Sequence, residues 1–263
     1  MLLLLLTVGP LCVLVLGSFM QRIGYFVLGF TLEHWRLVLS DPVFTKALRT
    51  TLVLAGTAAL CSPLIFSIVA YIIVRTRLPG RKLLDMMIWS AGAIPGILAG
   101  LGLLWVFVGT PGLNFLFGSI WALVIVVILQ GKTTGVNVMK GVLLQVGAEM
   151  EEAARVAGAG WIRTYVRIWL PLLSPTLMLL AVMNFVSAAG ATSSIILLAS
   201  RDTMTLSLMA LELSSNAVSN REAASIISIF IIAITLAGAL VVRACARRVG
   251  VQHEMQVPGA RLK

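Results

Sequence analysis

The stretch EEAARVAGAGWIRTYVRIWLP runs from Glu151 to Pro171 and separates two strongly apolar parts of the chain. Its first half is rich in acid and alanine, and Gly158 and Gly160 interrupt it. Ala153 and Ala157 lie four positions apart, so a helix here would present a small-residue face that a partner can approach closely. Because glycine weakens a helix, we predict two short helices that meet at an angle near Gly158.

The composition around this stretch is that of a membrane protein. Of the 263 residues, 59% are hydrophobic and only 11% are charged, whereas about 25% are charged in a typical soluble domain. Stretches without Asp, Glu, Lys or Arg are Met86–Gln130, Ile168–Ser200 and Ala223–Val242. A spanning helix needs about 20 apolar residues, so the first stretch can hold two spans and each of the others one. Together with Leu2–Phe19 and Thr50–Val74, they predict an all-α, polytopic membrane protein with about six transmembrane helices.

The positions of lysine and arginine predict how these spans are oriented. With both termini in the cytoplasm, the cytoplasmic segments hold 14 of the 20 basic residues, as expected because positively charged loops are retained there. The net charge of +10 is dispersed over several segments, which argues against nucleic-acid binding. We predict a single transmembrane domain over residues 1–263, with a cytoplasmic loop at about 132–170 and a basic cytoplasmic tail at about 243–263.

The opening stretch resembles the EAA signature of binding-protein-dependent ABC importer permeases: E-A-A, three residues, G, nine residues, I-x-L-P. A lone Glu-Ala-Ala triplet is ordinary helix composition, whereas the full pattern with both spacings, in a predicted cytoplasmic loop before a membrane helix, is specific. The matching residues are Glu152, Ala153, Ala154, Gly158, Ile168, Leu170 and Pro171. The chain is therefore similar to type I importer permeases from about Thr50 to Arg243.

This resemblance implies a transporter driven by a partner. In the family, the two signature helices act as coupling helices that dock into a groove on a dimer of ATP-binding subunits. Glu152 is then the expected charged contact, and Gly158 permits the turn. A second permease half, identical or homologous, would complete the path, and an extracytoplasmic binding protein would deliver the solute. The expected location is the bacterial inner membrane, with lipid around the spans, no cofactor and no enzymatic activity in this chain.

The residues themselves predict neither a nucleotide site nor a metal site. Gly131-Lys132-Thr133 looks like the end of a P-loop, but such a loop needs a glycine five positions before Gly131, where this chain has Val126. The three cysteines lie in or beside apolar segments without the spacing of metal ligands. ATP is therefore expected to act through a partner.

Polar but uncharged residues occur in the fifth predicted span. Asn184 and Ser187 are three positions apart and share a helix face, so they are candidates for lining a transport path. The alternative is that they bond only their own or a neighbouring helix. The last four spans have no ionisable residue at mid-depth, which disfavours proton-coupled transport. Asp85, near the cytoplasmic end of the third span, is expected to be neutralised beside Arg81.

Small residues predict a close helix contact in the third span. Gly92, Gly96 and Gly100 repeat at four-residue spacing around Pro95. On one helix face they let two backbones approach closely, which favours packing within the subunit over a moving gate. Further along, apolar residues at helical spacing in the segment 206–213 predict a short helix that either gates the outer mouth or packs on the outer ends of the spans.

The prediction of a substrate depends on a weaker resemblance. The region from Ala189 to Leu213 and the short basic tail look most like ferric-iron permeases, which often occur as fused pairs of such halves. Polyamine and phosphonate permeases are similar alternatives. Two rivals belong to other classes: an ion-coupled secondary transporter, which would need an essential acid such as Asp85, and a membrane anchor with no path of its own.

Overall fold

The computed structural model of the chain describes residues 2–22, 29–147, 149–215 and 220–248. Within these ranges there is no β-strand, and one isolated bridge joins Met20 and Phe30. The long helices are α1 (Leu2–Phe19), α3 (Pro42–Arg75), α6 (Ile120–Gln145), α9 (Leu170–Ala189) and α11 (Arg221–Arg248). The shorter elements are α2 (Glu33–Ser40), α4 (Arg81–Ala91), α5 (Gly96–Gly109), the 3-10 turn η2 (Asn114–Leu116), α7 (Glu149–Val156), α8 (Trp161–Thr164), the π-turn η3 (Tyr165–Trp169), the 3-10 turn η4 (Arg201–Thr203) and α10 (Leu206–Ser214).

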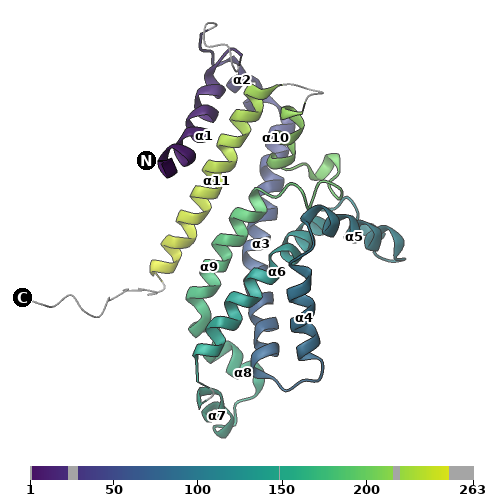
Figure 1. Cartoon of the computed structure of the whole chain (residues 1–263), viewed down its shortest axis with the longest axis vertical. Helices are drawn as coiled ribbons and strands as arrows, with labels where there is room; N and C mark the ends of the chain where they lie inside the picture. Colours follow the sequence, from purple (N-terminus) through teal and green to yellow (C-terminus); the bar gives the residue numbers. More distant parts are fainter. Residues whose placement is uncertain (1, 23–28, 148, 216–219, 249–263) are drawn as a thin grey trace, which may run out of the picture.

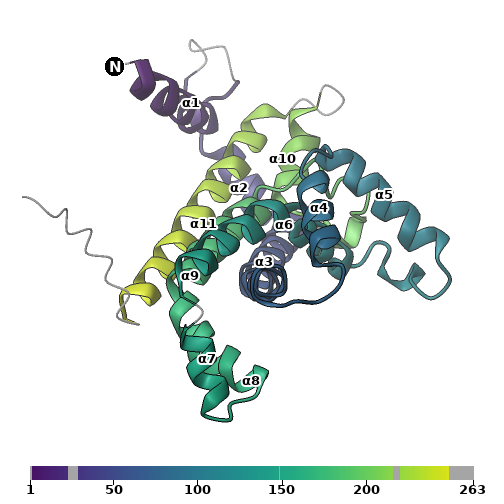
Figure 2. The same ribbon diagram turned by 60° about the horizontal axis from the view of Figure 1, so that its bottom comes forward.

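Helix α3 is the central element of the bundle, with α6 and α9 packed along it (Figures 1 and 2). It begins eight residues before the predicted span, because Asp41 caps it by accepting a 2.8 Å hydrogen bond from the Val43 N–H and Pro42 occupies the first turn. Helix α2 and the first turns of α3 therefore precede the predicted span Thr50–Val74.

Small and aromatic side chains fill the bundle between α3, α6 and α9. Near one end, Phe66, Tyr71 and Trp169 are buried together, and toward the other end Ala55 and Ala188 let the backbones come close. In lipid, burying an apolar side chain against protein gains little over leaving it in the acyl chains, so helix association depends on such close packing. The all-α prediction is confirmed, and the packing explains how a chain with so few charges holds one arrangement.

The third predicted span is not a straight helix. Its two parts, α4 and α5, meet at 120° across a break of no more than four residues, and α5 points away from the bundle in both views (Figures 1 and 2). Pro95 lacks an N–H and disfavours a helical residue before it, so the helix stops there. Gly92 therefore ends α4 and Gly96 begins α5, and the expected continuous glycine face over Gly92, Gly96 and Gly100 is corrected to two separate helix ends.

The predicted six spans correspond to four or five membrane-crossing helices among the residues that the structure describes. Four of the described helices are long and apolar enough to cross a membrane, or five if α4 and α5 count as one broken span. Helix α1 has the predicted bounds, but the apolar helical stretch Val8–Phe19 within it is shorter than a span.

The predicted loop at about 132–170 is shorter than expected, because α6 continues to Gln145. Two lysines in this part of α6 are accommodated on the helix. The Lys132 Nζ donates to the Leu129 carbonyl at 2.9 Å, and Lys140 forms an ion pair with Asp85 of α4. The partner of Asp85 is thus Lys140 and not the expected Arg81.

Pro171 lies in the first turn of α9, where its missing N–H is tolerated, and α8, η3 and α9 form one continuous helical run from Trp161 to Ala189. The run passes through a π-turn directly before Pro171, with the Leu170 N–H bonded to the Tyr165 carbonyl. A proline inside a helix removes one donor of the ladder, and a π-turn is a recognised way to absorb such a local mismatch. The signature's last residues therefore lie at and just before the start of α9, within one continuous helical run.

At the end of the bundle opposite α7 and α8, the predicted short helix is confirmed as α10. Thr51 of α3 holds its start, because the Thr51 Oγ1 accepts a 2.9 Å hydrogen bond from the Leu206 N–H. Nearby, Lys46 of α3 pairs with Asp202 at 2.6 Å. The hydrogen bond from Lys46 holds the pKa of the exposed Asp202 carboxyl below its usual range.

Candidate functional site

The signature segment, residues 151–171, forms a knob at one end of the bundle, where α7 and α8 project beyond the long helices (Figure 1). The chain reverses after α7 because Gly158 adopts φ +75°, a left-handed conformation that glycine takes without strain. The Ala159 N–H then closes the end of α7 by donating to the Ala154 carbonyl at 2.9 Å. This geometry confirms the predicted break into two short helices.

The signature residues divide between the surface and the interior. Glu152, Ala153, Gly158 and Pro171 are exposed, Ile168 and Leu170 are half-buried, and Ala154 is buried. Glu152, which the resemblance assigns to the charged partner contact, is therefore uncovered in this chain, whereas Ala154 of the same signature is not.

Apolar side chains surround these exposed signature residues. Val156 is 90% exposed and Ile162 is 70% exposed, and Met150 and Val166 are also exposed. Contiguous exposed apolar surface rimmed by polar residues marks protein interaction sites in soluble regions. Arg163 adds positive charge to the same surface. The knob thus has the features of a docking surface.

A charged hydrogen-bond network holds the inner side of the knob against α3. Glu151 is only 7% exposed, although Glu152 beside it is exposed. The Tyr71 hydroxyl donates to the Glu151 Oε1 at 2.9 Å, and Arg155 pairs with the same oxygen at 2.6 Å. A buried carboxylate is tolerated only when it is paired and hydrogen-bonded in this way.

Aromatic rings extend this network around Tyr71. Its ring centroid lies 6.0 Å from those of Trp161, Tyr165 and Trp169, which come from α8 and η3. The Arg75 guanidinium lies 4.9 Å from the centre of the Trp169 ring and also donates to the carbonyls of Leu143, at 2.6 Å, and Val146. One turn of α3 therefore contacts every element that carries the knob.

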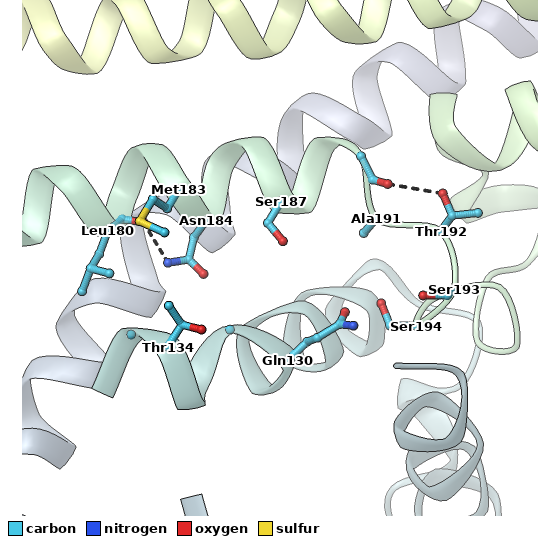
Figure 3. A pocket seen from close by; sticks show the side chains of 13 residues that line it. Gln130, Thr134, Leu180, Met183, Asn184, Ser187, Ala191, Thr192, Ser193 and Ser194 are labelled. Atoms are coloured by element: carbon cyan, nitrogen blue, oxygen red, sulfur yellow. Dashed lines mark hydrogen bonds between the residues drawn. The ribbon is translucent and has the colours of Figure 1, made fainter. Parts of the chain in front are cut away.

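A second feature is a polar cavity of about 490 Å³ in the middle of the bundle (Figure 3). Asn184 and Ser187 point into it from α9, and Gln130 and Thr134 face them from α6. The remaining wall is the segment 190–194 that follows α9. Both sequence candidates for path-lining residues thus lie at one cavity, although the Asn184 Nδ2 also donates to the Leu180 carbonyl at 2.8 Å.

The cavity presents hydrogen-bonding groups without charge. No charged residue is among the described residues that line it. The side chains of Gln130, Thr134, Ser187 and Ser193 have no hydrogen-bond partner among the residues that the structure describes. The Ser194 hydroxyl also has none, although Ser194 is only 1% exposed. Because unpaired polar groups are costly at membrane depth, this concentration indicates that the cavity accommodates water or a polar solute.

Helix α5 and the end of α4 press closely on this region. A Cβ atom added to Gly96 would lie 2.5 Å from the Gln130 Nε2, and one added to Gly100 would lie 2.4 Å from the Ser194 carbonyl oxygen. At Gly92 it would lie 2.9 Å from the Thr133 Cγ2. The three glycines thus lie at close contacts with α6 and the cavity wall, despite the break between them.

Several residues of these two sites were not identified as candidates from the sequence alone. Gln130 and Thr134 are polar positions four apart in an apolar helix, a pattern that places them on one face and was visible in advance. Tyr71 carried no such pattern, because a tyrosine near the end of a span usually marks the membrane interface. Its contact with Glu151 joins residues 80 positions apart and depends on tertiary structure.

Comparison with known proteins decides the family. Residues 63–251 match the model of the family described as binding-protein-dependent transport system inner membrane component. The chain belongs to this family. It is a permease of the type I ABC importers, in which a separate subunit hydrolyses ATP, and it resides in the inner membrane as a multi-pass protein.

Curated relatives of the permease include proteins of two transport systems. It is 27% identical over 179 residues to the sulfate transport system permease protein of Salmonella typhimurium, covering 64% of this chain and 63% of the relative. It is 29% identical over 165 residues to the ferric transport system permease protein of Actinobacillus pleuropneumoniae, covering 63% of this chain and 24% of the relative. The permease thus spans less than two thirds of the length of either relative.

Solved structures share the fold of the permease at low sequence identity. A bacterial ABC transporter involved in the import of the acidic polysaccharide alginate matches with a TM-score of 0.76 and 19% identity, covering 93% of this chain and 91% of that one. An inward-facing methionine ABC transporter matches with a TM-score of 0.56 and 18% identity, covering 81% and 98%. These likenesses support the arrangement of the helices.

Proposed function

We propose that the permease moves a solute, delivered by an extracytoplasmic binding protein, across the bacterial inner membrane, and that an ATP-binding subunit docks on α7 and α8. In this proposal the α7–α8 end of the bundle and both termini are cytoplasmic, and α10 lies on the outer side. The central cavity is part of the path, and a second permease half, identical or homologous, completes it.

The observation that carries this proposal is the exposed signature surface. Glu152 and Ala153 are uncovered at the tip of the molecule, surrounded by exposed apolar side chains such as Val156 and Ile162. Lipid does not explain that surface, because the acidic α7 and the basic Arg163 lie within it. A soluble partner with an apolar groove and a basic residue opposite Glu152 fits it.

The charges of the chain also support a partner-driven mechanism. Asp85, the acid that a proton-coupled transporter would need, is paired with Lys140 near the α7–α8 end and away from the cavity. The cavity contains no carboxylate that could relay a proton among its described residues. The energy of transport is therefore assigned to ATP hydrolysis in the partner.

For the solute, we propose an inorganic ion, with ferric iron and sulfate as the two candidates. Relatives named for each are similar to the permease. The cavity favours sulfate, because hydroxyl and amide groups such as those of Ser187, Ser194 and Gln130 donate hydrogen bonds to an oxyanion. Among the described residues, no group of three or more His, Cys, Asp or Glu could hold a metal ion.

Uptake into proteoliposomes tests this function. The complex purified with its ATP-binding subunit and binding protein is reconstituted with ATP enclosed, and uptake of ⁵⁵Fe(III)-citrate and ³⁵S-sulfate is measured. We expect one of the two ions to accumulate only with ATP, also when a protonophore is present, and Glu152→Lys to abolish that uptake. Uptake that proceeds without ATP, follows a proton gradient and is lost in Asp85→Asn would instead establish secondary transport.

A further inference from the structure

Two consecutive acids of α7 point in different directions. Glu152 is exposed on the knob, whereas Glu151 is 7% exposed and faces α3. Glu152 matches the first position of the family signature, whereas Glu151 lies outside the signature. The inward position of Glu151 is therefore not explained by docking of a partner.

The partners of Glu151 show what its inward position achieves. Its Oε1 accepts a 2.9 Å hydrogen bond from Tyr71 of α3 and pairs with Arg155 of α7 at 2.6 Å. Tyr71 is 2% exposed and is enclosed by the rings of Trp161, Tyr165 and Trp169. The direct side-chain hydrogen bond between α7 and α3 thus runs through one hydroxyl at the centre of a packed aromatic cluster.

Helix α3 carries this contact to the opposite end of the molecule. Thr51 lies 20 positions before Tyr71 on the same helix, which corresponds to about 30 Å at 1.5 Å per residue. There the Thr51 Oγ1 accepts a 2.9 Å hydrogen bond from the Leu206 N–H at the start of α10. Helix α10 is in turn bonded to the cavity wall, because the Ser207 Oγ donates to the carbonyl of Ala191. A displacement of α7 that moves α3 as a unit therefore also reaches this wall.

We infer that Glu151 and Tyr71 are positioning residues that couple the docking surface to α3. Glu152 binds the ATP-binding subunit, and the hydrogen bond from Tyr71 to Glu151 makes α3 follow α7 when that subunit closes on ATP. Without the bond, α7 moves while α3 and the cavity stay behind, so ATP is hydrolysed without opening the cavity. This inference rests on the proposed function.

A substrate-independent assay tests the inference on the complex of the permease and its ATP-binding subunit, purified and reconstituted into proteoliposomes. The three native cysteines are replaced by alanine, and Ser187→Cys reports access to the cavity through its rate of reaction with a membrane-impermeant maleimide added outside. The ratio of this rate with ADP–vanadate to that without nucleotide measures coupling. The same preparations are assayed for bound ATP-binding subunit and for ATP hydrolysis.

Tyr71→Phe keeps the ring and removes the hydroxyl. We expect it to lower the labelling ratio about tenfold, the size expected for losing a hydrogen bond to a charged group, while subunit binding and ATP hydrolysis stay near wild type. Glu151→Gln keeps an acceptor for Tyr71, so it retains more of the ratio than Glu151→Ala. Glu149→Gln is the control, because it removes an exposed acid of the same helix and is expected to leave the ratio unchanged.

Combining Tyr71→Phe with Glu151→Ala separates a direct link from independent damage. If the two residues act through their shared bond, the double variant is no worse than Glu151→Ala alone. A wild-type labelling ratio in Tyr71→Phe, or additive losses in the double variant, would overturn the inference. If no ATP-binding subunit is bound to the unsubstituted permease, it is the proposed function that has failed, and this outcome is recorded before any variant is compared.

Discussion

Replacing Gly100 with alanine is expected to destabilise the permease, because the new methyl group has no space. Its Cβ would lie 2.4 Å from the backbone carbonyl oxygen of Ser194, an atom that cannot rotate away. Forcing an extra methyl into a packed site costs about 1–3 kcal/mol. Gly102 is the matched control: it lies in the same helix, and a Cβ there meets nothing within 4 Å.

The comparison between the two variants isolates the steric effect. Both substitutions replace a glycine in α5 and gain about 1 kcal/mol of helix propensity, so this gain cancels in their difference. Gly102→Ala is then expected to be about 1–3 kcal/mol more stable than Gly100→Ala.

The thermal midpoint of each detergent-solubilised variant measures this difference, for example by loss of the monodisperse peak in size-exclusion chromatography after heating. At about 2–4 °C per kcal/mol, the two midpoints should differ by about 2–12 °C. Equal midpoints for Gly100→Ala and Gly102→Ala would refute the close contact between α5 and the cavity wall.

Three further substitutions test the packing and the cavity. Gly135→Ala places a Cβ 2.0 Å from an aromatic ring of α3 and is expected to lower the thermal midpoint, whereas Gly141→Ala, with nothing within 4 Å, is not. Ser194→Ala removes a buried hydroxyl without a partner, so the protein should gain up to about 1 kcal/mol of stability while ATP-dependent uptake falls. Arg75→Met loses the guanidinium over Trp169 together with its two bonds to carbonyls, and an unfolding free energy lower by about 1.5–3 kcal/mol is expected from denaturant titration.

Local patterns in the sequence were sufficient to predict the two short helices of the knob and several long helices of the bundle. Gly158 has no Cβ and lies after an acidic, alanine-rich run, so the reversal between α7 and α8 could be predicted from composition alone. The charge-free stretches likewise predicted helices α9 and α11, because the cost of exposing backbone to lipid leaves helix as the local solution.

The predictions from sequence failed where the course of a helix depends on tertiary contacts or on a break at a proline. The cytoplasmic loop was predicted to begin at about residue 132, but Lys132 reaches a carbonyl of its own helix and Lys140 pairs with Asp85, so α6 continues past both. Gly92, Gly96 and Gly100 indicated one continuous helix face, but the helix breaks at Pro95 and turns by 120° between α4 and α5. The residues of a helix do not by themselves reveal which residue of another helix pairs with a charged side chain, or in which direction the next helix runs.

The docking of an ATP-binding subunit on α7 is the central claim, and site-specific photocrosslinking tests it most directly. A photoreactive amino acid replaces Ala153, which is exposed on the knob, and in a control replaces Val108, which is exposed on α5. After irradiation of intact cells, mass spectrometry identifies the crosslinked proteins. We predict a crosslink to an ATP-binding subunit from position 153 and none from position 108, with the first lost in Glu152→Lys. Crosslinks from position 153 to lipid or to unrelated proteins only would contradict the account.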